Sequence, residues 1–154
     1  MYTETRRKDR ILDNASALAL LDNGGYGVLS TADKKNQPYG IPVNYTVIDN
    51  TIFIHSAPEG HKLDNIKSNS KVSFCVVGKT RLLPDQFSIN YKSVIVFGTA
   101  TIVDDQDKRQ ALIALVAKYS PEHMDSGGKY IDNRIDKTVV IKVSIDHITG
   151  KQRK

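Results

Sequence analysis

Residues 39–62 read YGIPVNYTVIDNTIFIHSAPEGHK, and this stretch carries the clearest structural pattern in the chain. Two runs rich in β-branched and aromatic residues, 39–48 and 51–56, flank the dipeptide Asp49-Asn50. A dipeptide of this kind between two apolar runs is typical of a two-residue β-hairpin turn. Pro42 has no backbone N–H to donate, so the first strand is expected to lie at a sheet edge or to contain a bulge. The stretch therefore predicts an antiparallel hairpin.

The rest of the chain continues this pattern of short strands separated by turns. The strands expected are 26–32, 39–48, 51–56, 72–76, 94–99 and 139–145, and the helices expected are 8–23, 61–68 and 106–118. Six strands joined mainly by short turns predict a mainly β, α+β fold built on an antiparallel barrel. Residues 78–91 and 119–137 are interpreted as two long connections, which in a small barrel could cover a ligand or a partner subunit.

Length and composition are those of an ordinary globular protein. The 154 residues fit one domain, 1–154, and the content of 40% hydrophobic and 25% charged residues is near the average. The one cysteine, Cys75, lies in an apolar run and is predicted to be a buried, reduced thiol. No signal peptide and no stretch long enough to span a membrane is visible, so a cytoplasmic protein without a membrane partner is expected.

The positive charge is concentrated at the two ends of the sequence. The formal net charge is +5, and the ends contribute all of it, because residues 1–10 sum to +2 and residues 151–154 to +3. Residues 11–150 therefore balance to zero, and two short basic ends are interpreted as solvated tails. This distribution argues against a specific nucleic-acid partner, although a basic interaction protein is kept as a third hypothesis.

One strand-to-helix turn within the opening stretch has the chemistry of an anion site. Gly60 permits a tight backbone path, and the helix predicted after it presents unpaired N–H groups at its start. His61 and Lys62 occupy the first turn of that helix, where a cation is unfavourable unless an anion such as a phosphate binds there. Ser56 could add a hydroxyl donor. The residues alone equally allow a surface helix capped by Ser56 or Glu59, with both basic groups facing water.

Other common motifs are missing from the sequence. The histidines and Cys75 show none of the close pair spacings of a zinc site, so no metal site is predicted. No Walker loop and no dinucleotide-binding glycine motif occurs. No side chain stands out as a general acid or base, so the catalytic residues stay unassigned.

Eight segments in order carry a resemblance that spans nearly the whole chain. They are RRKDR at 6–10, YGVLST at 26–31, QPYGIPVNY at 37–45, HSAPEGHKLDN at 55–65, FCVVG at 74–78, YKSVIVFG at 91–98, KYSP at 118–121 and HITGK at 147–151. In these segments the chain resembles the pyridoxamine-phosphate-oxidase-like, FMN-binding split-barrel superfamily. More narrowly, it resembles the nitroimidazole-resistance type of flavoprotein.

The resemblance implies a six-stranded antiparallel split β-barrel with short flanking helices, which forms a homodimer with FMN in each of two interface grooves. It implies that strand 41–45 runs past the flavin ring, largely through backbone groups, and that the turn after residue 55 reaches the phosphate. The cofactor-binding residues carried over are Val43, Asn44, Tyr45, His55, Ser56, Ala57, His61 and Lys62. The partner chain is expected to contribute from Phe87–Ser93 and from Lys151.

Taken singly, these residues also fit ordinary roles. Val43 could be a core residue, Asn44 and Tyr45 ordinary strand residues, His55 a structural histidine, and Lys151 a solvated tail residue. The residue types do not decide between these roles and the cofactor site.

The function implied is that of an FMN-dependent oxidoreductase, resembling a flavin reductase or nitroreductase. A nicotinamide or another donor would supply hydride, and a small-molecule acceptor, which could be a nitroaromatic compound such as a 5-nitroimidazole, would receive the electrons. The chain has no tryptophan and lacks the C-terminal stretch of pyridoxamine-phosphate oxidases proper, so that oxidase activity is not expected. The alternative from another class is a flavin- or haem-binding storage or sensor module without turnover.

Overall fold

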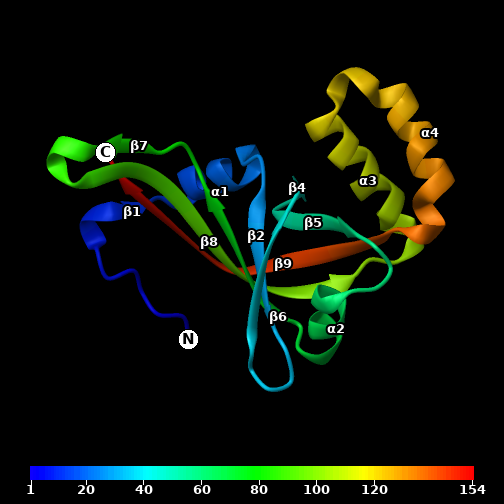
Figure 1. Cartoon of the computed structure of the whole chain (residues 1–154), viewed down its shortest axis with the longest axis horizontal. Coiled ribbons are helices and arrows are strands. Elements are labelled where there is room, and N and C mark those ends of the chain that lie inside the picture. The colour runs from blue at the N-terminus through cyan, green and yellow to red at the C-terminus, as the bar shows by residue number, and fades with distance from the viewer.

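Nine antiparallel strands form the framework of the computed structural model, which describes residues 1–154 (Figure 1). The sheet has the order β3-β2-β6-β8-β9-β5-β4, with β1 paired to β9 and β7 paired to β8. The strands are β1 Ile11–Leu12, β2 Gly27–Ala32, β3 Pro38–Val43, β4 Thr46–Ile48, β5 Thr51–Ser56, β6 Lys71–Val77, β7 Arg81–Leu83, β8 Ser88–Ile102 and β9 Val139–Arg153. The helices are α1 Asn14–Asn23, α2 His61–Ser68, α3 Asp105–Tyr119 and α4 Met124–Arg134.

The sheet curls into a half-barrel because its two central strands are long and bent. β8 and β9 each run for 15 residues, and their pairing shifts register between Phe97 and Gly98. A Cβ on Gly98 would lie 2.5 Å from the carbonyl oxygen of Ser144, so this close approach requires glycine. The predicted mainly β, split-barrel class is confirmed, with nine strands in place of the six predicted.

The main core lies inside the curled sheet and under α1. It contains 17 buried residues, including Leu21 from α1 and Leu29, Phe74 and Val96 from three neighbouring strands. α1 begins at Asn14 because the side chain of Asp13 accepts a hydrogen bond from the backbone N–H of Ser16 at 2.9 Å.

Residues 39–62 form the predicted hairpin, but their first strand differs from the predicted one. Asp49 and Asn50 have φ values of 49° and 56°, which is the left-handed pair that a two-residue hairpin turn requires. β3 lies at the edge of the sheet, as Pro42 predicted. The predicted strand 39–48 is in fact two strands, β3 and β4, because the chain bends between Val43 and Thr46.

Four other predicted boundaries are wrong. The predicted helix 8–23 starts only at Asn14, because Ile11 and Leu12 pair with Lys151 and Gly150 of β9. The connection predicted for residues 78–91 contains β7 and a hairpin to β8. The predicted strand 139–145 continues to Arg153, so Lys151 and Arg153 are strand residues rather than parts of a solvated tail.

The connection predicted for 119–137 is the fourth of these. It contains α4, which packs on α3 over a second core cluster of six buried residues, Phe53, Ala111, Leu112, Leu115, Ile131 and Val140. α4 buries only Ile131 and includes two adjacent glycines, Gly127 and Gly128, whose low helix propensity makes the segment resemble a loop in the sequence. Tertiary packing on α3 rather than local pattern specifies this helix.

Two further expectations concern burial and the membrane. Cys75 is half-buried rather than buried, because the neighbouring residues Phe74 and Val76 point into the core and turn its side chain to the opposite face. Partial burial raises the pKa of the thiol. None of the helices has the length and apolar character needed to cross a membrane.

Candidate functional site

The strand-to-helix turn joins β5 to α2 through a glycine with a positive φ. β5 ends at Ser56, and α2 begins at His61. Gly60, between them, has φ 141° and ψ 168°, a conformation that residues with a Cβ rarely adopt. Its carbonyl oxygen accepts the N–H groups of Leu63 and Asp64, both at 3.1 Å. No side chain caps this helix, so its first N–H groups are available to an anion.

Both basic residues predicted for the phosphate lie at this helix start. His61 is exposed, and its ring packs against that of Tyr39 on β3 with 4.1 Å between the ring centroids. Lys62 is half-buried and lies near enough to His55 to influence its ionisation. The fold thus brings His55, His61 and Lys62 into one neighbourhood, between the edge strand β3 and the end of β5.

His55 and its neighbours open onto a groove that the sequence did not reveal. The groove has a volume of about 280 Å³, and its walls are the end of β5 and the segment from α4 to β9. Arg134 and Lys137 lie on the far wall from His55, Ser56 and Ala57. These two cations fall in the segment that was predicted to be an unstructured connection, so no sequence signal placed them near the turn.

The electrostatics of the groove favour an anion, because Arg134 and Lys137 line it and no acidic side chain does. The pKa of His55 is lowered, first by desolvation of its imidazole and second by the positive charge of Lys62, although the residue is exposed at the surface. The hydroxyl of Ser56 is buried and donates to the carbonyl oxygen of Ala57 at 2.9 Å, so it would have to rotate to reach a ligand. Backbone N–H groups and cations are therefore the available donors.

The edge strand β3 has one open side that leads toward this turn. It pairs only with β2, so alternate backbone groups along its other edge have no partner in the sheet. The side chain of Val43 packs against the core, which leaves its backbone for any ligand contact, while Asn44 is exposed. This agrees with a strand that would meet a ring mainly through backbone groups.

Tyr45 differs from the other predicted site residues because its side chain is fully enclosed in the core. Its side chain is fully buried, its ring packs on Phe74, and its hydroxyl donates to the carbonyl oxygen of Leu21. Its backbone is held by Tyr119. The Tyr119 hydroxyl accepts a hydrogen bond from the Tyr45 N–H at 3.1 Å and donates one to the carbonyl oxygen of Gly25 at 2.8 Å. Tyr45 thus anchors the bend after β3, and its side chain presents no surface to a ligand.

A second buried group at this bend is the amine of Lys118. Its Nζ lies 3.8 Å from the centre of the Tyr45 ring and has no hydrogen-bond partner. Burial lowers the pKa of Lys118. The KYSP segment thus supports the strand bend through Lys118 and Tyr119, a role that its sequence did not predict.

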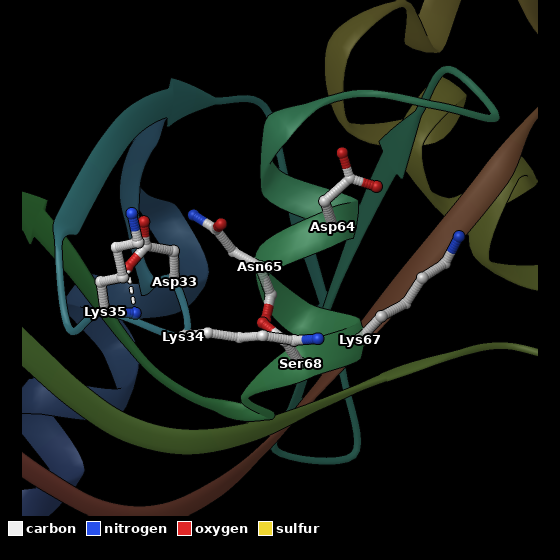
Figure 2. A pocket seen from close by; sticks show the side chains of 7 residues that line it. All are labelled: Asp33, Lys34, Lys35, Asp64, Asn65, Lys67 and Ser68. Atoms are coloured by element: carbon white, nitrogen blue, oxygen red, sulfur yellow. Dashed lines mark hydrogen bonds between the residues drawn. The ribbon is translucent and has the colours of Figure 1, made fainter.

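Figure 2 shows a different hollow of about 550 Å³, between the β2–β3 turn and α2, whose lining side chains are Asp33, Lys34, Lys35, Asp64, Asn65, Lys67 and Ser68. No hydrophobic residue lines it, and its charges are of both signs. Asp33 is used inside its own turn, where it accepts the N–H groups of Lys35 and Gln37 at 2.8 and 2.9 Å. The hollow therefore lacks the apolar wall that an aromatic cofactor ring needs.

The residues expected to come from a partner chain lie at the opposite end of the sheet. Phe87–Ser93 forms the β7–β8 hairpin and the start of β8, and Phe87 is 98% exposed. Lys151 sits within β9, opposite Ser93 of β8, and is half-exposed. No group of three metal-ligating side chains is present.

The curled antiparallel sheet, with α1 against its core and α3 and α4 at one end, defines a mainly β protein of the split-barrel class (Figure 1). A family model described as pyridoxamine 5'-phosphate oxidase matches residues 13–152. The chain belongs to this family. No curated protein matches the sequence.

Solved structures share this fold at low sequence identity. A candidate 5-nitroimidazole antibiotic resistance protein of Bacteroides thetaiotaomicron is 23% identical, with 92% of this chain and 86% of that chain covered and a TM-score of 0.79. A conserved hypothetical protein of Mycobacterium tuberculosis is 19% identical, with 97% and 90% covered and a TM-score of 0.83. An FAD-binding protein of Mesorhizobium loti is 22% identical, with 94% and 98% covered and a TM-score of 0.68.

Proposed function

We propose that this protein is an FMN-dependent reductase that works as a homodimer on a small-molecule acceptor. The observation that carries the proposal is the turn at Gly60, where an uncapped helix start, His61 and Lys62 converge beside His55. This donor set suits a terminal phosphate monoester, because backbone N–H groups and cations both favour the charged form. The fold-sharing FAD-binding protein of Mesorhizobium loti supports a flavin as the carrier of that phosphate.

The residues present would divide the work between the phosphate and the ring. His61, Lys62 and the N–H groups of α2 would hold the phosphate, and Arg134 and Lys137 would add positive charge in the neighbouring groove that they line with His55, Ser56 and Ala57. The open edge of β3, ending at Asn44, would supply backbone groups to the ring. The flavin itself would supply the redox chemistry, taking hydride from a reduced nicotinamide and passing electrons to the acceptor.

The homodimer is supported by apolar side chains that the single chain leaves uncovered. Val77 and Ile95 are 59% and 40% exposed on the sheet face opposite the core, and Leu82 and Phe87 are 72% and 98% exposed on the β7–β8 hairpin. Exposed apolar groups gathered on one face mark an interaction surface. A second copy of the chain would cover them and would bring its own Phe87–Ser93 segment toward the flavin site.

The experiment is a visible spectrum of the purified protein after FMN is added and free flavin is removed. A bound flavin band that bleaches when a reduced nicotinamide is added without oxygen is the expected result. A bound flavin that no donor reduces would instead favour the storage or sensor function, and a protein that retains no flavin would refute both. Sedimentation equilibrium of the native chain and of Phe87→Ser tests the homodimer, which the variant should weaken.

A further inference from the structure

The strongest unassigned feature is the contact between the start of α2 and the edge strand β3. The ring of Tyr39 on β3 packs against the ring of His61, the first residue of α2, with 4.1 Å between the ring centroids and 31° between the ring planes. Tyr39 is half-buried, whereas His61 is exposed and takes part in none of the four ion pairs of the chain. The packing on Tyr39 therefore holds this imidazole in place.

A buried polar chain joins the same elements one turn further along α2. The Nδ2 of Asn65 donates to the Oγ1 of Thr31 on β2 at 2.9 Å, and that hydroxyl donates to the carbonyl oxygen of Tyr39 at 3.4 Å. Asn65 and Thr31 are only 3% and 4% exposed, and Figure 2 shows Asn65 pointing from α2 toward the β2–β3 turn. Because breaking the chain would leave buried polar groups unpaired, α2 is held to β3 through both the side chain and the backbone of Tyr39.

Tyr39 also belongs to the strand that is proposed to meet the flavin ring. The side chains of Tyr39, Ile41 and Val43 share one face of β3, and Ile41 and Val43 pack against the core. Four residues of extended strand separate Tyr39 from Val43, which is roughly 13 Å of backbone. A ligand that contacts both the open edge near Val43 and the turn at Gly60 must therefore be elongated, and Tyr39 is the residue through which these two regions touch.

We propose that Tyr39 is a positioning residue of the flavin site, which holds the His61 imidazole at the place of the flavin phosphate. This inference rests on the proposed function. The aromatic ring of Tyr39 acts, since the ring makes the contact with His61. A side chain that is already ordered loses less conformational entropy when the ligand arrives, so the contact strengthens the binding of the phosphate without touching it.

The test is a double-mutant cycle read by the Kd for FMN, with riboflavin titrated in parallel. Tyr39→Ala should weaken FMN binding by about three- to tenfold, as expected for the loss of one aromatic pair, and should change the Kd for riboflavin by less than about twofold. In a His61→Ala background the same substitution should have no further effect on FMN, because its action passes through His61. Tyr39→Phe retains the ring and should keep the native affinity.

Two further measurements keep the test sharp. If Tyr39→Ala does not fold in urea-unfolding experiments, Tyr39→Leu takes its place in the cycle, because leucine retains apolar bulk without a ring. The ring protons of His61, followed by NMR in the protein without flavin, should shift in the Tyr39 variants that lack a ring, since the neighbouring aromatic current is lost. Unchanged His61 resonances would overturn the inference whatever the flavin affinities are.

The remaining outcomes separate this inference from the function on which it rests. An equal loss of FMN and riboflavin, or a Tyr39 effect that persists in the His61→Ala background, would show a merely structural role and overturn the inference. A native chain that binds FMN, with no loss on replacing Tyr39 by alanine, would overturn the inference alone. A native chain that retains no FMN would refute the proposed function, and the positioning role would fall with it.

Discussion

Replacing Lys62 by alanine should weaken the binding of FMN while leaving the fold intact. The side chain is half-buried at the first turn of α2, beside the turn at Gly60, which is the end of the helix proposed to hold the phosphate. A hydrogen bond to a charged group contributes about 1.5–3 kcal/mol, and about 1.4 kcal/mol is a tenfold change in Kd. Because His61 and the helix start remain, we expect the lower part of that range, about a ten- to thirtyfold weaker Kd for FMN.

The assay is the quenching of flavin fluorescence as the protein is titrated into FMN and, in parallel, into riboflavin. Riboflavin has the ring without the phosphate, so Lys62→Ala should change its Kd by less than about twofold if Lys62 acts on the phosphate. Lys67→Ala is the matched control, because it removes an exposed lysine from the last turn of the same helix. An unchanged FMN affinity, or an equal loss for riboflavin, would refute the assignment of Lys62 to the phosphate.

Three further substitutions test the supports of the site. Gly60→Ala should destabilise the protein by about 1–3 kcal/mol in urea unfolding, since φ 141° is strained for alanine. Tyr119→Phe should lower the free energy of unfolding by about 1 kcal/mol, because the hydrogen bonds of the hydroxyl to Gly25 and Tyr45 are lost. Lys118→Met removes an amine whose pKa burial lowers. The unfolded chain then holds this proton at higher pH than the native chain does, so the native protein should gain stability relative to the variant as pH rises toward 10.5, measured by unfolding at several pH values.

The sequence allowed much of the fold to be predicted because its strands carry local signals. The hairpin at Asp49-Asn50, the edge position of Pro42 and the helix start at His61 each follow from the conformational preferences of one or two residues. α4 was not predicted, because its adjacent glycines Gly127 and Gly128 have low helix propensity and only one of its side chains, Ile131, is buried. Its stability comes from packing on α3, which is a contact between distant parts of the chain.

The candidate site likewise combines residues that local sequence indicates with residues that only tertiary packing brings there. The Gly60 turn is local, so residues 55–62 could be recognised as a possible anion site from their order alone. Arg134 and Lys137 line the groove beside His55, Ser56 and Ala57 only because the chain folds back there after α4, and neither residue has a distinguishing feature in the sequence. Tyr45 was predicted to bind the cofactor, but its side chain is fully buried in the core. The neighbouring residue, Asn44, is exposed, so position along the strand did not reveal this burial.

The end of the sheet where β7 pairs with the start of β8 shows why a charge sum along the sequence conceals the local charge of a surface. Residues 11–150 have no net charge, yet three of their cations, Lys79, Arg81 and Lys92, face one space from which acidic side chains are absent. The pairing of β8 with β9 then adds Arg153, which sequence position alone assigns to a tail. Strand register, not composition, decides which charges are neighbours. The electrostatic potential at a surface depends mainly on charges within about 8 Å at physiological salt.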